Sequence, residues 1–234
     1  MRLDALLARL GYGSRSEVQK LIRSGLVQLE GQKALSPSQP YTGGAVTLRG
    51  QPVDTRLERH IMLNKPLGVV TAADDPSQPT VFSLLPPVYL SIQCMPVGRL
   101  DKDTSGLLLF TTDGELAHRL ISPKREVLKV YEAVVDSDLK TEDIESFRRG
   151  IQLSDFTAKP AELEIVESRL ARITVSEGKY HQVRRMLAAI GYQTVKLERK
   201  SFGPLSLDAG LPAGGFRELT EEELAALYQA AGMR

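Results

Sequence analysis

The chain has 234 residues, of which 42% are hydrophobic and 25% charged, and its net charge is +1. This composition is typical of a soluble globular protein, and the chain is long enough for one large domain or two small ones. A single cysteine, Cys94, excludes disulfides within the chain, and the three histidines lie too far apart to show a metal-ligand spacing. Early charged residues and the lack of any long apolar run argue against a secretory signal or a membrane span, so we expect a cytoplasmic protein.

The charge is unevenly distributed along the chain. Nine basic and five acidic residues give the first 59 positions a net charge of +4, and the remainder carries −3. A basic N-terminal region followed by a slightly acidic remainder suggests a contact with nucleic acid. An ordinary solvated surface explains this charge distribution equally well.

Residues 2–50 show the pattern of a compact module of helices and short strands. Leucines at positions 3, 6, 7 and 10 form one face of a predicted helix that ends at Gly11. Residues 14–17 read as a capping box that opens a second helix, which ends at Gly25. Short strands are expected at 27–29 and 45–48.

Basic side chains on and around these two helices could hold the phosphates of a nucleic-acid backbone at several fixed points. The pattern RLDxLLxRLGYxSRSE…LIRSGLVQLEGQ resembles the alpha-L RNA-binding module first described in a small-subunit ribosomal protein. The residues that we assign to RNA binding in this module are Arg2, Arg9, Ser14, Arg15, Lys20 and Arg23.

A larger domain follows a stretch, residues 51–59, that has no apolar periodicity and looks like a hinge. Strands outnumber helices in this domain and are often sequential, which favours a mixed, mainly antiparallel sheet flanked by helices. The predicted strands are 69–71, 107–111, 130–135, 161–166, 171–176 and 194–198. The predicted helices are 113–121, 141–150, 181–190 and 220–230.

The stretch GRLDKDTSGLLLFTTDG, residues 98–114, places Arg99 and Asp101 directly before a strand that reads as buried. A carboxylate in a turn most often caps a neighbouring amide. Partial burial at the edge of a strand would instead make Asp101 a better nucleophile or base, provided that a cation keeps it ionised.

Two other stretches carry candidate chemistry. In KVYEAVV, residues 129–135, Tyr131 is either an ordinary core tyrosine or a ring that stacks on a flipped-out base. In SEGKYHQVRRMLAAIG, residues 176–191, the consecutive Arg184 and Arg185 point about 100° apart on a helix. They are either a surface pair, or Arg184 turns inward to pair with a buried acid such as Asp101.

Taken in chain order, MLNKPLGVV, GRLDKDTSGLLLFTTDGELAHRL, KVYEAVV and EGKYHQVRRML resemble the RNA pseudouridine synthases. The branch is the one that modifies bacterial ribosomal RNA behind an alpha-L module, and the resemblance covers essentially the full chain. It implies an α+β protein with an alpha-L RNA-binding domain (1–53), a linker (54–59) and a pseudouridine synthase catalytic domain (60–234). The catalytic domain would have a mainly antiparallel mixed sheet flanked by helices.

The resemblance implies an isomerase that needs no cofactor and no metal. Such an enzyme breaks the N1–C1′ bond of a uridine, turns the base and rejoins it through C5. The essential aspartate of the family maps onto Asp101, its active-site tyrosine onto Tyr131, and the basic residue that pairs with the aspartate onto Arg184. The spacing is compatible with three roles for Asp101: attack on C1′, addition to C6, or removal of the 2′-hydrogen.

The expected partner is ribosomal RNA, bound by a monomer. DDPSQPTVF and YHQVRRM are most similar to members that act on small-subunit (16S) rRNA or an assembly intermediate, whereas LLLFTTDGEL and LPAGGF are similar to large-subunit (23S) members. The alternatives are a 23S enzyme and a ribosome-associated protein that binds RNA without catalysis; a hydrolase with an aspartate nucleophile is a distant third. The residues expected to contact RNA in the larger domain are Lys65, Arg99, His181, Gln182 and Arg185.

Overall fold

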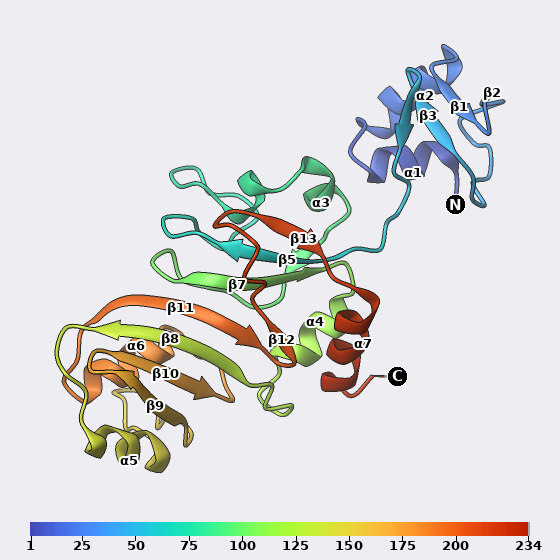
Figure 1. Cartoon of the computed structure of the whole chain (residues 1–234). Coiled ribbons are helices and arrows are strands. Elements are labelled where there is room, and N and C mark those ends of the chain that lie inside the picture. Colours follow the sequence, from blue (N-terminus) through green and yellow to red (C-terminus); the bar gives the residue numbers. More distant parts are fainter. Residues whose placement is uncertain (234) are drawn as a thin grey trace. The chain divides into compact units, whose positions relative to one another are not determined.

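The computed structural model describes residues 1–233, which form two compact units (Figure 1). The first unit contains Met1–Arg59 together with Pro86–Cys94, and the second contains His60–Leu85 and the chain from Met95 onward. Within residues 1–233, no helix combines the length and the apolar character that crossing a membrane requires.

The first unit contains short helices and a four-stranded antiparallel sheet in the order β2-β1-β3-β4. The predicted capping box is confirmed, because Ser14 accepts a hydrogen bond from Glu17 N while the Glu17 carboxylate accepts one from Ser14 N. The last strand is Gln51–Val53, so the first three residues of the predicted hinge 51–59 are wrong. The elements are α1 (Leu3–Arg9), α2 (Arg15–Arg23), β1 (Val27–Leu29), β2 (Gln32–Lys33), β3 (Val46–Leu48), β4 (Gln51–Val53) and α3 (Pro87–Ser91).

A fully buried carboxylate, Asp4, ties the two N-terminal helices together. Its oxygens accept hydrogen bonds from Arg2 Nε (3.0 Å) and Nη2 (2.9 Å), from Gln19 Nε2 (2.8 Å) and from Arg15 Nε (3.3 Å). Burial alone would raise the pKa of Asp4, but the hydrogen bonds from Arg2, Gln19 and Arg15 outweigh it and lower the pKa to about 2. Asp4 therefore stabilises the module and also fixes two of its arginines.

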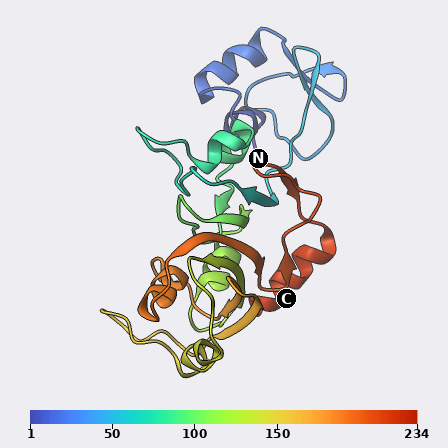
Figure 2. The same cartoon turned by 60° about the vertical axis from the view of Figure 1, so that its left-hand side comes forward.

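The second unit is built on a nine-stranded sheet in the order β13-β5-β7-β11-β8-β10-β9, with β6 and β12 paired to β7 and β11 (Figure 1, Figure 2). The strands are β5 (His60–Lys65), β6 (Met95–Pro96), β7 (Ser105–Thr111), β8 (Lys129–Val135), β9 (Glu162–Glu167), β10 (Leu170–Val175), β11 (Thr194–Phe202), β12 (Leu205–Ser206) and β13 (Phe216–Glu218). The helices are the 3-10 turn η1 (Val81–Leu84), α4 (Gly114–Ile121), α5 (Thr141–Arg149), α6 (Gln182–Ala189) and α7 (Glu221–Ala230).

Helices cover the sheet at two places and create two apolar cores. Around β8 to β11, buried side chains of the strands pack against Phe147 of α5 and Met186 of α6; in both views α6 lies beside these strands. Around β5 and β7, Leu116 of α4 and Leu227 of α7 complete the second core. The α+β architecture with a mainly antiparallel, helix-flanked sheet is confirmed.

One pair of strands departs from the antiparallel pattern and joins the two halves of the sheet. In the described residues, β7 and β11 are the one parallel pair, with Ser105 opposite Glu198 and Gly106 opposite Arg199. Gly106 has φ +103°, and a Cβ at this position would lie 2.7 Å from Arg199 N and closer still to its carbonyl oxygen. Glycine is therefore required for these backbones to approach.

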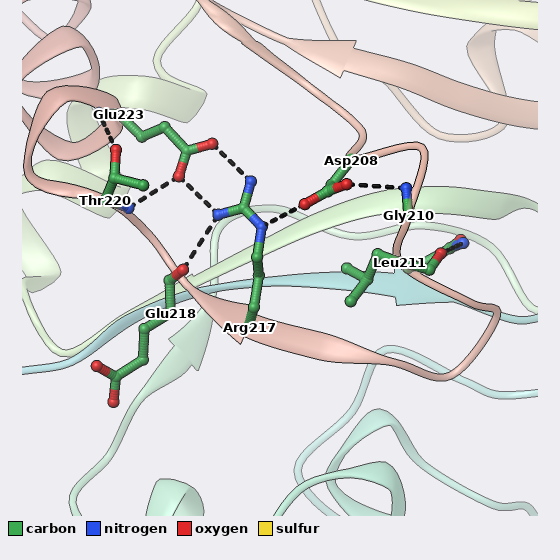
Figure 3. Close-up of polar contacts among 8 residues, drawn as sticks. Asp208, Gly210, Leu211, Arg217, Glu218, Thr220 and Glu223 are labelled. Atoms are coloured by element: carbon green, nitrogen blue, oxygen red, sulfur yellow. Dashed lines mark hydrogen bonds and ion pairs between the residues drawn. The ribbon is translucent and has the colours of Figure 1, made fainter.

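The edge strand β13 is held by a cluster of charged groups (Figure 3). The guanidinium of Arg217 donates from Nη1 and Nη2 to Glu223 and from Nε to Asp208, each at 2.7 Å. Glu223 also accepts from the backbone N of Thr220, the N-cap of α7. The cluster thus ties β13 to the start of the last helix.

One predicted strand of the larger domain is wrong. Residues 69–71 form a loop whose β-type backbone pairing, within the described residues, is one isolated bridge between Val70 and Thr80. The apolar side chain of Val69 is buried, but Thr71 uses its hydroxyl to donate to Leu100 O (2.8 Å) instead of pairing in a sheet.

We expect Asp4→Asn to destabilise the first unit, because an amide nitrogen would then face guanidinium donors. The pKa of Asp4 lies below its unfolded value of 3.8, so the stabilisation is complete above that value and is lost as pH falls toward about 2. At pH 7 the loss should be about 2 kcal/mol, measured as reduced hydrogen-exchange protection of α1 and α2 in the full chain. Equal protection in Asp4→Asn and in a control variant of the exposed Asp74, Asp74→Asn, would contradict this.

Candidate active site

The second unit contains a cleft of about 850 Å³. Its walls come from the loop 70–75, the segment 95–104, the strands β8, β10 and β11, and the loop that leads into α6. Asp101, Tyr131 and His181 all line this cleft, although they lie far apart in the sequence. The cleft is therefore where the sequence-predicted chemistry converges.

Asp101 lies in a tight turn that immediately precedes β7. Thr104 N donates to Asp101 O at 3.1 Å and closes the turn. Below it, the fully buried Lys65 donates from Nζ to the carbonyl oxygens of Asp101 (3.0 Å), Thr104 (2.9 Å) and Pro66 (3.0 Å). A buried ammonium group that satisfies all three of its donors in this way fixes the backbone of the turn.

The assignment of Lys65 to RNA binding is therefore wrong. Burial lowers the pKa of Lys65 to about 8, against the opposing effect of the Asp101 and Asp103 carboxylates. No part of the side chain reaches solvent, and its donors are all used by backbone carbonyls. Its position makes it a support for the Asp101 turn.

Tyr131 reaches the cleft because of strand register. Gly106 of β7 is opposite Arg199 of β11, and Arg199 is opposite Tyr131 of β8, so the three residues form one row across the sheet. Asp101 precedes β7 by only a few residues, which brings its turn next to this row. Tyr131 is half-buried, packs against the core around β8 to β11, and lines the cleft.

Three buried charged residues lie in the walls of the cleft: Lys129, Glu177 and Arg199. Arg199 donates from Nε to Leu107 O (2.8 Å), whereas its Nη2 has no hydrogen-bond partner among the described residues. Lys129 donates to Val127 O, and burial together with the nearby Arg199 lowers its pKa to about 8, against the opposing charge of Glu177. This part of the cleft is therefore electropositive.

The side chain that contacts the Asp101 carboxylate is the imidazole of His181. Its Nε2 lies 3.3 Å from Asp101 Oδ1, and the two side chains are 36% and 29% exposed. The ring of His181 stacks on that of Tyr180, with centroids 3.8 Å apart and planes at 17°. Asp101 is thus accessible from the cleft and has a protonatable partner.

The predicted pairing of Arg184 with Asp101 is wrong in this structure. Arg184 donates from Nη2 to Asp103 O (2.7 Å), pairs with the Asp103 carboxylate (3.3 Å), and donates from Nη1 to Thr194 O (3.3 Å). From α6 its guanidinium meets Asp103, and it links the turn to the first residue of β11. It braces the backbone near Asp101 instead of touching the carboxylate.

The other predicted RNA contacts of this unit fall into two groups. Arg99 is exposed and lines the cleft, as its neighbour Lys102 does. Gln182, in contrast, is buried and uses its amide on Glu177 and on the backbone of Lys179, so its side chain is not offered to RNA. Arg185 pairs with the carboxylate of Asp155 and donates to the hydroxyl of Ser154, so its guanidinium lies against the loop 154–156.

The predicted RNA-binding residues of the first unit also divide. Arg2 and Arg15 are held by Asp4, and Ser14 serves as the cap of α2. Among the described residues, no ion pair involves the remaining three cations, which are exposed on α1 and α2: Arg9, Lys20 and Arg23.

Sequence reasoning missed Lys129, Arg199 and Glu177. The alternation of KVYEAVV puts Lys129 on the same strand face as Tyr131, which is a sign that could have been used. The predicted strand 194–198 stops one residue before Arg199, and nothing in the local sequence shows that Arg199 turns inward. Residues 1–233 contain no group of three or more histidine, cysteine, aspartate or glutamate side chains placed to hold a metal.

Comparisons with known proteins agree with this geometry. Residues 59–189 match the family model "RNA pseudouridylate synthase", and residues 1–46 match "S4 domain". An uncharacterized RNA pseudouridine synthase of Bacillus subtilis, YtzG, is 45% identical over 96% of this chain and 97% of its own length. The ribosomal small subunit pseudouridine synthase A of Escherichia coli is 39% identical over 97% of this chain and 100% of its own.

A solved structure, described as a pseudouridylate synthase, has 35% sequence identity and a TM-score of 0.69, and the match covers 97% of this chain and 99% of that one. The protein is thus an isomerase, which sets aside the alternatives of a hydrolase and of a protein that only binds RNA. The resemblance seen in the sequence is confirmed: the chain belongs to the RNA pseudouridine synthases and carries an S4 domain ahead of its catalytic domain.

Proposed function

We propose that the protein converts a uridine of small-subunit (16S) ribosomal RNA into pseudouridine, with Asp101 as the essential carboxylate. The observation that carries this proposal is the meeting of Asp101 and Tyr131 in one cleft. The relative from Escherichia coli, named for the ribosomal small subunit, supports the choice of RNA because the similarity extends over both full chains. Ribosomal RNA as substrate also favours action in the cytoplasm.

Each residue around the turn has a distinct part in the proposed reaction. Breaking the N1–C1′ bond leaves positive charge at C1′, which a nearby carboxylate stabilises by its field or by covalent capture. Asp101 is the accessible carboxylate beside the electropositive wall, and Tyr131 offers a ring to hold the detached uracil by stacking. Lys65 and Arg184 position the turn without touching the substrate.

The proposed roles of the two units differ. The exposed Arg99 and Lys102 flank Asp101 and are placed to meet phosphates next to the target uridine. The exposed cations of α1 and α2 would add phosphate contacts to the same RNA. The monomeric state stays a prediction, as do the domain boundaries at 53 and 60.

Asp101→Asn should reduce tritium release from 5-tritiated uridine in rRNA transcripts by at least about 100-fold, because an amide cannot stabilise the positive charge or act as a nucleophile. RNA affinity should be nearly unchanged, since the amide keeps the shape of the side chain. Glu167→Gln, which makes the same carboxylate-to-amide change at an exposed position of β9 outside the cleft walls, is the matched control. Substantial turnover by Asp101→Asn would refute the catalytic assignment.

The choice of rRNA is tested by mapping pseudouridine in both ribosomal RNAs from cells with and without this gene. We expect one 16S position to revert to uridine in the deletion strain and to return when the wild-type gene, but not Asp101→Asn, is restored. A site lost from 23S rRNA instead would show that the target belongs to the large subunit.

Replacing Arg9, Lys20 and Arg23 together by alanine should weaken RNA binding and reduce the slope of log affinity against log salt by about 2 to 3, as expected for three lost phosphate contacts. The measurement is a salt titration of binding to the rRNA transcript. The control is a second triple alanine variant with the same change in charge, in which the exposed cations Lys140, Arg148 and Arg149 at α5 are replaced. Equal slopes for the two triple variants would count against an RNA-binding role for α1 and α2.

A further inference from the structure

An aromatic side chain is strongly exposed at the active-site cleft. Tyr180 is 71% exposed and lines the cleft, and its one ring contact in the described structure is the stack on His181. With one ring face on the imidazole and most of the residue in solvent, the other face is open. Tyrosine is enriched at binding surfaces because its ring offers an apolar face while its hydroxyl stays in water.

The segment that carries Tyr180 is held by buried hydrogen bonds. Glu177 is buried and accepts from Gln182 Nε2 (2.7 Å) and from Lys159 N (3.0 Å). Gln182 Oε1 in turn accepts from Lys179 N (3.0 Å). The open ring is thus presented on a fixed frame, so little conformational entropy would be lost when a partner binds it.

The stack also leads directly to the reactive carboxylate. His181 contacts Asp101 through Nε2 and contacts Tyr180 through its ring face. A flat group placed on the open face of Tyr180 would therefore extend the stack that includes the imidazole in contact with Asp101. Two further exposed apolar side chains, Met95 and Ile121, line the same cleft, and Lys179 and Lys102 add exposed positive charge.

We propose that Tyr180, supported by His181, is a stacking platform for the base of a nucleotide adjacent to the target uridine in single-stranded RNA. Unpaired bases are held in this way by aromatic rings with little sequence preference, while nearby cations meet the phosphates. The cleft, at about 850 Å³, is near the upper end of the roughly 300–1,000 Å³ usual for ligand pockets, which leaves room beyond a single nucleoside. The proposal rests on the RNA pseudouridine synthase activity and adds a second base to the recognised substrate.

The competing explanation is that Tyr180 only orients the His181 imidazole toward Asp101. That role would act on the chemical step, so a loss of the ring would lower kcat. A stacking platform acts on binding and would raise KM. Tyr180→Leu removes the ring and keeps an apolar side chain, whereas Tyr180→Phe keeps the ring.

The first measurement uses a heptamer of uridines that carries 2-aminopurine on the 5′ or the 3′ side of the central uridine. Binding to the wild-type full chain should quench the 2-aminopurine fluorescence at one of the two positions, and Tyr180→Phe should behave alike. Tyr180→Leu should abolish the quenching and weaken binding roughly tenfold, the effect of losing one base stack. Val195→Ser, which changes an exposed apolar residue outside the cleft lining, is the control.

The second measurement is tritium release from rRNA transcripts. Tyr180→Leu should raise KM roughly tenfold and leave kcat close to that of the wild type, with recovery in Tyr180→Phe. Undiminished quenching by Tyr180→Leu, or a fall in kcat at constant KM, would overturn the platform. Wild-type protein that releases no tritium from rRNA would refute the proposed rRNA substrate alone, because the fluorescence measurement does not depend on turnover.

Discussion

The active-site turn depends on one buried ammonium group. Moving a charged amine out of water costs several kcal/mol unless its donors are satisfied, and Lys65 meets that condition with three backbone carbonyls, two of them in the turn. The same contacts that make the burial of Lys65 tolerable fix the direction in which Asp101 leaves the backbone. Loss of the amine would leave the carbonyl oxygens of the Asp101 turn without donors. The burial of Lys65 and the position of Asp101 are therefore coupled.

The second constraint is the parallel pairing of β7 and β11. It needs a residue without a side chain at 106, and it lines up Gly106, Arg199 and Tyr131 in one row. Within the stretch 98–106, Gly106 allows the close pairing of β7 and β11, while Asp101 lines the cleft. Arg184 adds a brace from α6 through Asp103 and Thr194. Precision at Asp101 comes from contacts that no substrate touches.

Much of the fold could be predicted from sequence, because periodicity and caps are local. The capping box at Ser14 and the strand of KVYEAVV follow from neighbouring residues alone. Side-chain partners could not be predicted in the same way. A lysine looks exposed until the fold buries it, and two consecutive arginines give no sign of which carboxylate, Asp101 or Asp103, is nearer. The apolar content of residues 69–71 predicts a buried strand. Apolar content indicates burial but does not show whether the backbone pairs with another strand, and here it does not.

The parallel pairing of β7 and β11 also has a consequence for the order in which the cleft forms. Antiparallel neighbours that follow each other in the chain, such as β9 and β10, can join by local closure, but β7 must wait for β11, which is made much later. Closing so long a loop is slow, and contacts between distant segments form late in folding. During synthesis, Asp101 leaves the ribosome well before Arg199 does. A nascent chain therefore exposes Asp101 before Arg199 and its strand are present, and the cleft is complete only once the last third of the chain has been made.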